Sequence, residues 1–202
     1  MLLYAASNNA HKISELTLAF QNCEIRSPAE AGINFEFEET EDSFTANSLA
    51  KAMALWKLIG KPVLADDSGL CVDALDGRPG VYSARYGSVD GKTPLGSLER
   101  NRLLLKEMEG KSLRSCRFVC SLSLLISPYR FFVIQETLEG QLLYEPIGQG
   151  GFGYDPIVFL PELGKSVAEL EAAEKNKLSH RGKAVLKMTK IIGTLKAAND
   201  LC

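Results

Sequence analysis

The sequence has few of the features that direct a chain into a membrane or out of the cell. No apolar run reaches the roughly 20 residues that a membrane-spanning helix requires. The opening segment MLLYAA has neither a basic region nor a long apolar stretch with a cleavage-like site, which secretory signals contain. We therefore expect a cytoplasmic protein that does not bind a membrane.

Cysteine and histidine are also scarce. The five cysteines are an odd number, and only Cys116 and Cys120 lie close together in the sequence. The two histidines, His11 and His180, form no zinc-ligand spacing with the cysteines. In a cytoplasmic protein this pattern favours reduced thiols over disulfides or a structural zinc site.

An excess of charge of one sign is missing as well. The formal net charge of −2 gives no electrostatic footprint for duplex nucleic acid, although a local basic pocket for a small anion stays possible. The 202 residues are 46% hydrophobic and contain neither repeats nor low-complexity linkers. This composition predicts a sizeable core and one domain over residues 1–202.

Strand-like and helical patterns are mixed along the chain. Short apolar runs predict strands over 2–6, 23–26, 63–66, 115–127 and 130–139, the last two forming an antiparallel hairpin, and a further short strand after the glycine-rich loop near 150. Helical periodicity covers 7–20, 42–60, 95–109 and the chain from about residue 166, with an interruption near 176–184. These patterns predict an α/β fold.

The first turn, YAASNNAHK, is suited to an anion. A strand runs there into small polar residues and a helix start, which presents backbone N–H groups and the positive end of a helix dipole. Lys12 is near enough to reach the same anion. An ordinary capped helix with a surface lysine is the alternative.

Two segments in the first half of the chain carry neighbouring carboxylates. VLADDSGL begins as a buried strand and runs into Asp66 and Asp67. The acidic segment FEFEETEDSF carries Glu36, Glu38, Glu39, Glu41 and Asp42. Because Mg²⁺ usually takes one or two protein carboxylates together with water and phosphate oxygens, one carboxylate from each place is enough for a magnesium site. A turn or cap built from Asp-Asp-Ser-Gly and a solvated acidic loop are the alternatives.

Two later segments carry aromatic and basic groups. GGFGYDP combines glycines, which allow close backbone approach, with Phe152 and Tyr154, whose flat faces suit a heterocycle. EKNKLSHRGKA concentrates basic side chains around a helix start that Ser179 is expected to cap. A β-bulge with aromatic packing and a solvated basic helix end are the respective alternatives.

Taken in order, these segments closely resemble the inosine triphosphate pyrophosphatase family, which hydrolyses non-standard purine nucleoside triphosphates. The matching segments are ASNNAHKISEL (6–16), ETEDSFTANSLAKA (39–52), ADDSGLCVDALDGRPGVYSARY (65–86), GGFGYDPIV (150–158) and EKNKLSHRGKA (174–184). The resemblance implies an elongated mixed β-sheet flanked by helices, two lobes around a central cleft, and a homodimer. Ala46-Asn47-Ser48 departs from the Glu-Asn-Ala that family members often have, which puts a supporting contact in doubt.

The resemblance also implies roles for individual residues. It makes Glu39 and Asp67 the ligands of Mg²⁺, with Asp67 also the proton acceptor. It places substrate-binding residues in the first turn, beside the metal, in the glycine-rich loop and in the basic segment: Ser7, Asn8, Asn9, Ala10, His11, Lys12, Ser68, Phe152, Gly153, Tyr154, Asp155, Lys175, His180 and Arg181. Within this set, the first turn surrounds the triphosphate, and the later residues contact the base and ribose. Asn47 and Lys51 match polar positions without an assigned role, and Asp66 is expected to accept hydrogen bonds from backbone N–H groups.

The implied reaction is attack of water on the α-phosphorus, which releases a nucleoside monophosphate and pyrophosphate. Mg²⁺ neutralises the triphosphate while a carboxylate activates the water, and a nearby cation keeps Asp67 ionised beside Asp66. ITP, dITP and XTP are the expected substrates, because their 6-oxo group accepts a hydrogen bond where the 6-amino group of adenine donates one. Donors from Arg181, His180 or the backbone fit this requirement.

Three other interpretations stay open. A pyrophosphatase of the related Maf type prefers pyrimidine or modified nucleotides, and the SHRG segment argues against it. A nucleotide sensor binds its ligand without turnover. A structural α/β protein leaves the joint occurrence of these motifs unexplained.

Overall fold

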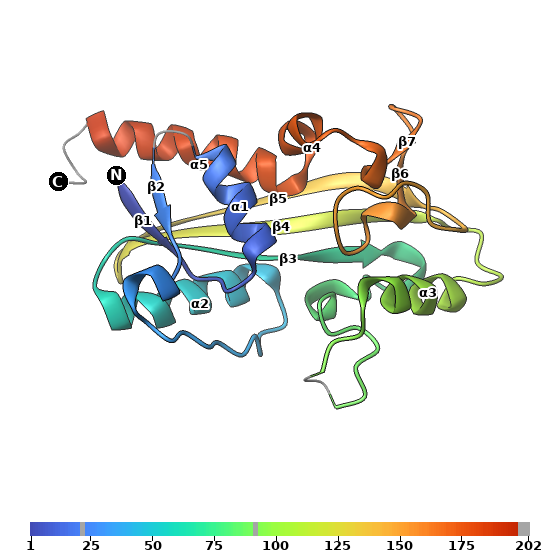
Figure 1. Ribbon diagram of the computed structural model, residues 1–202, viewed down its shortest axis with the longest axis horizontal. Helices are drawn as coiled ribbons and strands as arrows, with labels where there is room; N and C mark the ends of the chain where they lie inside the picture. The colour runs from blue at the N-terminus through green and yellow to red at the C-terminus, as the bar shows by residue number, and fades with distance from the viewer. Residues whose placement is uncertain (21–22, 91–92, 198–202) are drawn as a thin grey trace. The chain divides into compact units, whose positions relative to one another are not determined.

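The structure is a computed structural model that describes residues 1–20, 23–90 and 93–197. In this part of the chain, seven strands form one sheet in the order β2-β1-β3-β4-β5-β6-β7 (Figure 1). The strands are β1 (Leu2–Ala5), β2 (Glu24–Arg26), β3 (Val63–Val72), β4 (Ser115–Ser127), β5 (Arg130–Leu142), β6 (Val158–Leu160) and β7 (Lys165–Ser166). The α-helices are α1 (Ala10–Ala19), α2 (Phe44–Ile59), α3 (Ser97–Glu107), α4 (Ala172–Leu178) and α5 (His180–Ala197).

Strand directions show that the sheet is mixed. β1 pairs in parallel with β2 and β3, whereas β6 pairs antiparallel with β5 and β7. β4 and β5 are neighbours joined by two residues, a connection that only antiparallel strands allow. The predicted α/β class with a mixed sheet flanked by helices is confirmed, as is the hairpin.

The chain falls into two compact units that share the long strands β3, β4 and β5. Unit 1 comprises Met1–Asp67, Cys120–Glu136 and His180–Cys202, and unit 2 comprises Ser68–Val119 and Thr137–Ser179.

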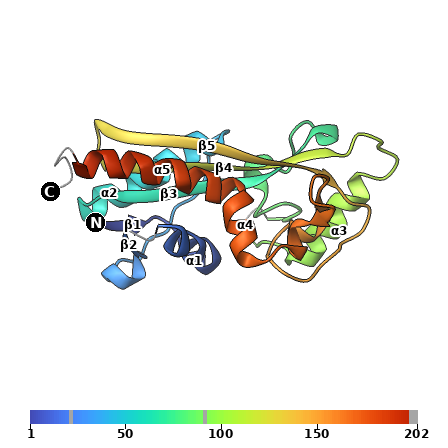
Figure 2. The ribbon, with the colours of Figure 1, turned by 90° about the horizontal axis from the view of Figure 1, so that it is seen from above.

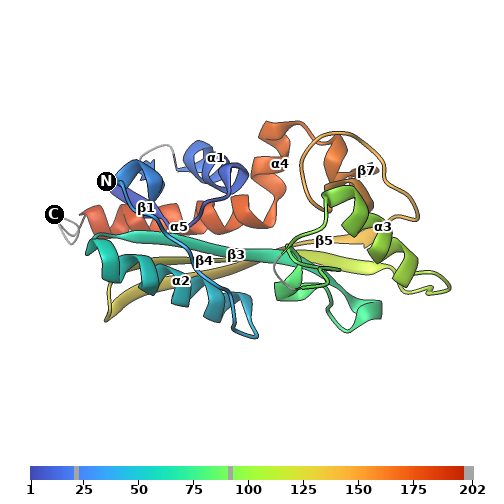
Figure 3. The same cartoon turned by 60° about the horizontal axis from the view of Figure 1, so that its bottom comes forward.

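In unit 1, helices cover both faces of the sheet. One core cluster joins α1 and α5, through Leu16 and Met188 among others, to Leu64 of β3. The other joins α2, through Leu55, to Ala65 on the opposite face of the same strand. Figures 2 and 3 show α1 and α5 together on one face and α2 on the other. Neighbouring residues of β3 therefore enter different cores, as the alternation of side chains along a strand requires.

Unit 2 has its own core between α3 and the other ends of the shared strands. Leu104 of α3 and Met108, which caps its C-terminal end, pack with apolar side chains of β3, β4, β5 and β6. The antiparallel register Leu142↔Val158 attaches β6 to this sheet. The chain between β6 and the end of β5 includes the glycine-rich loop of residues 148–153, so the core holds both ends of that loop.

Local signals account for the helix ends. The Asn9 side chain caps α1 by accepting hydrogen bonds from the backbone N–H groups of His11 (3.0 Å) and Lys12 (3.2 Å). Ser43 caps α2 in the same way, and α2 ends at Gly60, whose φ of +59° is the left-handed conformation that glycine favours. The predicted interruption in the last helical region is also confirmed, since Ser179 is extended (φ −63°, ψ 153°) between α4 and α5.

The main error in the sequence-based prediction concerns β3. It was expected to end at Asp66, with a turn or cap as the alternative interpretation of Asp-Asp-Ser-Gly, but it continues to Val72 and keeps both aspartates inside a strand. Gly69 is needed there for packing, because a Cβ atom at this residue would lie 2.4 Å from the carbonyl oxygen of Gly80. The small residues after Asp67 therefore admit the 80–83 turn against the strand and do not form a turn themselves. Smaller differences are the extension of β5 to Leu142 and the unpredicted strand β7.

Cys23, Cys71, Cys116 and Cys120 are free thiols, as predicted, and Cys202 lies outside the described residues. Among the helices that the structure describes, none has the length and apolar character needed to cross a membrane.

Candidate active site

The adjacent aspartates of β3 point to opposite faces of the sheet. Asp66 and Asp67 are 1% and 2% exposed. Because successive side chains in a strand alternate, Asp66 lies on the face of α1 and α5 and Asp67 on the face of α2. The two carboxylates thus have different neighbours and need separate explanations.

Asp66 is neutralised by two basic side chains from distant parts of the chain. Lys12 Nζ lies 3.1 Å from its Oδ1, and Arg181 donates to its Oδ2 from Nε (3.1 Å) and Nη2 (2.9 Å). Burial opposes the charged form, but the attraction of Lys12 and Arg181 outweighs burial and holds the pKa of Asp66 well below its ordinary range. The predicted structural role fits, but the donors are charged side chains where backbone N–H groups were expected.

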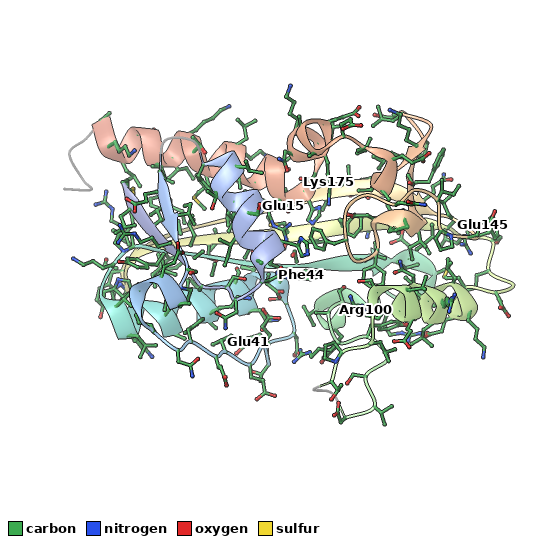
Figure 4. The ribbon with its side chains drawn as sticks, viewed as in Figure 1. Glu15, Glu41, Phe44, Arg100, Glu145 and Lys175 are labelled. Carbon is green, nitrogen blue, oxygen red and sulfur yellow. The ribbon has the colours of Figure 1, made fainter. Side chains whose placement is uncertain are left out.

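Arg181 has a second acidic partner, which the sequence reasoning missed. It is 3% exposed and also donates from Nη1 to Glu15 of α1, a residue labelled in Figure 4. Glu15 follows Lys12 by three residues, so both lie on the same face of α1. That spacing, next to an anion-binding motif, is the signal that would have found it.

Asp67 lies among groups of both signs. Burial and the negative charge of Glu39 raise its pKa to about 6, partly offset by Lys12, Lys51 and a hydrogen bond from Asn47. The expected like-charge neighbour was Asp66, and the structure puts Glu39 in that role, because Asp66 points to the other face. Proximity of Glu39 and Asp67, which lie 28 residues apart in the sequence, agrees with their prediction as a pair.

Asn47 and Lys51 of α2 hold the acidic segment in place. The Asn47 amide exchanges hydrogen bonds with the backbone of Glu41, accepting from its N–H (3.0 Å) and donating to its carbonyl (3.2 Å), and Lys51 forms an ion pair with Glu39. Glu41 is labelled at the end of this segment in Figure 4. Asn47 and Lys51 are four residues apart on the buried face of α2, at 0% and 7% exposure. Their occurrence on a largely apolar face of the helix is the sequence signal that could have indicated this role in holding the acidic segment.

Ser48, part of the segment that departs from the family pattern, is also buried. Its hydroxyl lies 2.8 Å from that of Ser123 and 3.2 Å from that of Ser121, both on β4. The serine at this position, where family members often have alanine, therefore adds a network of hydroxyl contacts between α2 and β4.

The first turn matches the capped-helix interpretation in part. Asn9 accepts from two helical N–H groups, so α1 is an ordinary capped helix, and Asn8 donates to the carbonyl of Phe35 (2.7 Å). Lys12, however, is not a surface lysine: its side chain is 17% exposed and reaches Asp66. The turn places a cation beside the two aspartates of β3. His11 and Ala10 are exposed at the start of α1.

The predicted residues of unit 2 form a second group around Asp155. This buried carboxylate accepts from the backbone N–H of Phe152 (2.8 Å) and pairs with Lys175 of α4 (2.7 Å), which is labelled in Figure 4. The Lys175 ammonium also lies 4.5 Å from the centre of the Phe152 ring. Gly151 (φ +70°) is required here, since a Cβ atom would lie 2.1 Å from Asp155 Oδ2.

Tyr154 has a different role from the one expected. It is 5% exposed in the core of unit 2, and its hydroxyl donates to the carbonyl of Ser83 (2.9 Å). The ring therefore packs in the core and offers no flat face to a heterocycle, because its apolar surface is used to hold the loop. Phe152 is half-buried, and Ser68 is half-buried within β3.

The raised pKa of Asp67 predicts a gain in stability when its charge is removed. A pKa raised from 3.8 to about 6 corresponds to roughly 2–3 kcal/mol against folding with Asp67 ionised. This cost is absent below about pH 4, grows as the pH rises, and is complete above about pH 6. In EDTA, Asp67→Asn should therefore be more stable than the unmodified protein by roughly 2–3 kcal/mol at pH 8. Urea unfolding at pH 8 and pH 4 checks this, and an equal difference at both values would contradict it.

Comparisons with known proteins identify the family to which the chain belongs. Residues 3–191 match the model of the Ham1 family. The dITP/XTP pyrophosphatase of Treponema denticola is 44% identical over 192 residues, which cover 95% of this chain and 98% of that protein. The dITP/XTP pyrophosphatase of Bacillus subtilis is 40% identical over 191 residues, 93% of this chain and 94% of that protein.

Solved structures give the same result. The HAM1 protein from Coxiella burnetii has a TM-score of 0.88 at 32% identity, and the Staphylococcus aureus Ham1 protein has a TM-score of 0.86 at 33% identity. Each comparison covers 96% of this chain and 99% of the solved one. The resemblance predicted from the sequence motifs is confirmed, and the chain belongs to the Ham1 family.

Proposed function

We propose that this protein hydrolyses the non-standard purine nucleoside triphosphates ITP, dITP and XTP between the α- and β-phosphates. The products are a nucleoside monophosphate and pyrophosphate. The observation that carries the proposal is the half-buried Glu39 beside the buried Asp67, with Lys12 and Lys51 close enough to act on the charge of Asp67. The dITP/XTP pyrophosphatases that are 40% and 44% identical over nearly the whole chain support this choice of substrate.

We also propose that the enzyme depends on Mg²⁺ held by Glu39 and Asp67. The described residues contain no group of three or more His, Cys, Asp and Glu side chains placed to hold a metal ion. Two carboxylates nevertheless fit Mg²⁺, which completes its coordination with water and substrate oxygens. Their mutual repulsion, seen in the raised pKa of Asp67, is what a divalent cation would relieve. When bound, Mg²⁺ would neutralise the negative charge of the triphosphate.

In this proposal the side chain of Asp67 accepts the proton of the attacking water. Its pKa of about 6 in the free protein means that it is mostly ionised at neutral pH and is still a base of suitable strength. Asn47 donates a hydrogen bond that favours the ionised form. Lys12 and Lys51 add positive charge that favours bound phosphate groups, and Asp66 holds Lys12 in place.

Selection of the base is assigned to the segments that the motifs indicate. A donor from His180, Arg181 or the backbone would pair with the 6-oxo group of hypoxanthine or xanthine and would face a second donor in adenine. A site that leaves buried polar groups unpaired can reject such an analogue by about 10⁴-fold. The half-buried ring of Phe152 would stack on the base without selecting it, and Lys175 and Asp155 hold that ring in place.

The decisive test is a substrate panel. The purified protein is incubated with Mg²⁺ and, separately, with ITP, XTP, ATP, GTP and a pyrimidine triphosphate, while pyrophosphate and orthophosphate are measured. We expect pyrophosphate from ITP and XTP, with turnover of ATP and GTP lower by at least about 10-fold. Parallel samples in EDTA should show little turnover.

Each other outcome identifies a specific error. Orthophosphate as the first product would move the cleavage away from the α-phosphorus. A preference for the pyrimidine nucleotide would favour a Maf-type enzyme. A rise in melting temperature with ITP but no turnover would favour a nucleotide sensor. A homodimer and a cytoplasmic location belong to the same proposal, supported by the family resemblance.

A further inference from the structure

One polar side chain of unit 2 is buried without having been predicted as part of the site. Asn101 lies on α3, is 3% exposed, and is followed by the core residues Leu104 and Met108. Its Nδ2 donates a hydrogen bond to the carbonyl oxygen of Gly153 (3.1 Å). Gly153 stands in the middle of the FGYD stretch, immediately after Phe152, so α3 reaches the backbone of the predicted base-binding loop.

That loop has a glycine on each side of Phe152. Gly151 and Gly153 both have positive φ, +70° and +65°, and glycine gives the backbone a wide choice of conformations. On the side of Phe152, the loop is held by Asp155, which accepts from the Phe152 N–H. One residue after Phe152, Asn101 fixes the direction of the Gly153 carbonyl. The Gly153–Tyr154 peptide plane is therefore oriented by a residue more than 50 positions earlier.

The second polar atom of the Asn101 amide shows that stability alone does not explain why an asparagine occupies this buried position. Its Oδ1 is buried and has no hydrogen-bond partner in the described structure. An unpaired buried acceptor loses its hydration without compensation, and an apolar side chain of the same shape would avoid that loss. The amide orientation is not arbitrary, because exchanging its two ends would place Oδ1 against the Gly153 carbonyl. A residue that costs stability in this way and contacts the base-binding loop is better explained by function.

The neighbouring residue supports the same interpretation. Arg100 donates to the carbonyls of Ala84 (3.0 Å) and Leu95 (2.8 Å), and its guanidinium lies 5.9 Å from the centre of the Tyr154 ring. Figure 4 labels Arg100 on α3. Consecutive residues of α3 thus contact Gly153 and Tyr154, which are themselves consecutive. This helix acts as a rigid support for the loop.

We propose that Asn101 is a positioning residue for base selection. It fixes the orientation of the Gly153 carbonyl and thereby the orientation of the neighbouring Phe152 ring. The inference rests on the proposed function, since it assigns the loop to base recognition. Asn101 acts through the loop and takes no part in the hydrolytic step.

The test compares Asn101→Leu and Asn101→Asp with the unmodified protein. Leucine matches the shape of asparagine and removes both polar atoms, and aspartate keeps the shape but presents an oxygen where the donor was. We expect both variants at pH 8 to raise KM for ITP about 10-fold with a smaller change in kcat, and to lower the preference for ITP over GTP by a similar factor. Arg102→Leu, the next residue along α3 and exposed, is the matched control and should leave both quantities unchanged.

Stability measurements separate positioning from folding. Asn101→Leu should unfold at about the same urea concentration as the unmodified protein, because removal of the unpaired acceptor offsets the loss of the hydrogen bond to the Gly153 carbonyl. A clear loss of stability, with the preference for ITP over GTP unchanged within twofold, would make Asn101 a purely structural residue and overturn the inference. If the unmodified protein itself fails to release pyrophosphate from ITP, the proposed function fails. Normal turnover with unaffected Asn101 variants would refute only the inference.

Discussion

Replacing Asp67 by asparagine is expected to lower the rate of pyrophosphate release from ITP by about 10²–10⁴-fold, the usual contribution of a positioned general base. The substitution keeps the shape of the side chain and its place among Asn47, Glu39 and the two lysines. It removes the proton acceptor and one of the two carboxylates assigned to Mg²⁺. Because the same change is expected to stabilise the protein at pH 8, misfolding would not explain a loss of activity.

The control for this experiment is Asp76→Asn. Asp76 is exposed and has a φ of +53°, a conformation that asparagine also adopts readily. It makes the same chemical change at a carboxylate outside the candidate site, so the rate should stay within about twofold of the unmodified protein. An Asp67→Asn enzyme that keeps more than about a tenth of the rate would exclude Asp67 as the general base.

Replacing Asp66 by asparagine is expected to have the largest effect on stability. The carboxylate neutralises Lys12 and Arg181, and Arg181 is almost fully buried. Breaking a buried ion pair by removing one partner leaves an uncompensated charge, which typically costs about 3–5 kcal/mol. The free energy of unfolding in urea at pH 7 should fall by that amount.

A surface pair provides the comparison for Asp66. Asp73 pairs with Arg117 (2.8 Å), and both side chains are about one third exposed, at 31% and 34%. Exposed pairs contribute about 1 kcal/mol or less, so Asp73→Asn should lower stability only slightly. A loss below about 1 kcal/mol for Asp66→Asn as well would show that Arg181 is held by other partners.

The pH dependence gives a further check on Asp66. A carboxyl whose pKa is lowered by folding contributes stability above its unfolded pKa, and this contribution is lost as the pH falls through the folded pKa. The difference between the unmodified protein and Asp66→Asn should therefore be constant between pH 5 and 8. It should shrink below about pH 4. A difference that shrinks towards alkaline pH would contradict the assigned direction.

The sequence was a good guide wherever the cause of a structure is local. Asn9 and Ser43 are side chains that cap helices, and Gly60 suits a left-handed helix end, so α1 and α2 were recognisable from a few consecutive residues. The hairpin of β4 and β5 was equally visible in its apolar runs and short connection. The requirements of a magnesium site predicted one carboxylate from each of the two acidic segments, and the family resemblance selected Glu39 and Asp67.

The prediction failed where distant partners decide the outcome. Asp66, Asp67, Ser68 and Gly69 have turn-like composition, yet they lie inside β3 because residues from other elements compensate them. Lys12 and Arg181 neutralise one aspartate, and Asn47 donates to the other. Tyr154 was misjudged for a related reason, since a ring beside glycines looks available until the core of unit 2 encloses it.

By itself, the sequence determined the α/β class, the helix ends and the family, and it proposed the candidate site residues, because each depends on short motifs and on the order of elements. Only the tertiary structure decided which charged side chains lie close together. Alternation along β3 separates two neighbouring carboxylates onto opposite faces, so one is neutralised by Lys12 and Arg181 and the other lies beside Glu39 with a raised pKa. Electrostatic energies depend on distance in space and on burial, and neither can be read from positions along the chain.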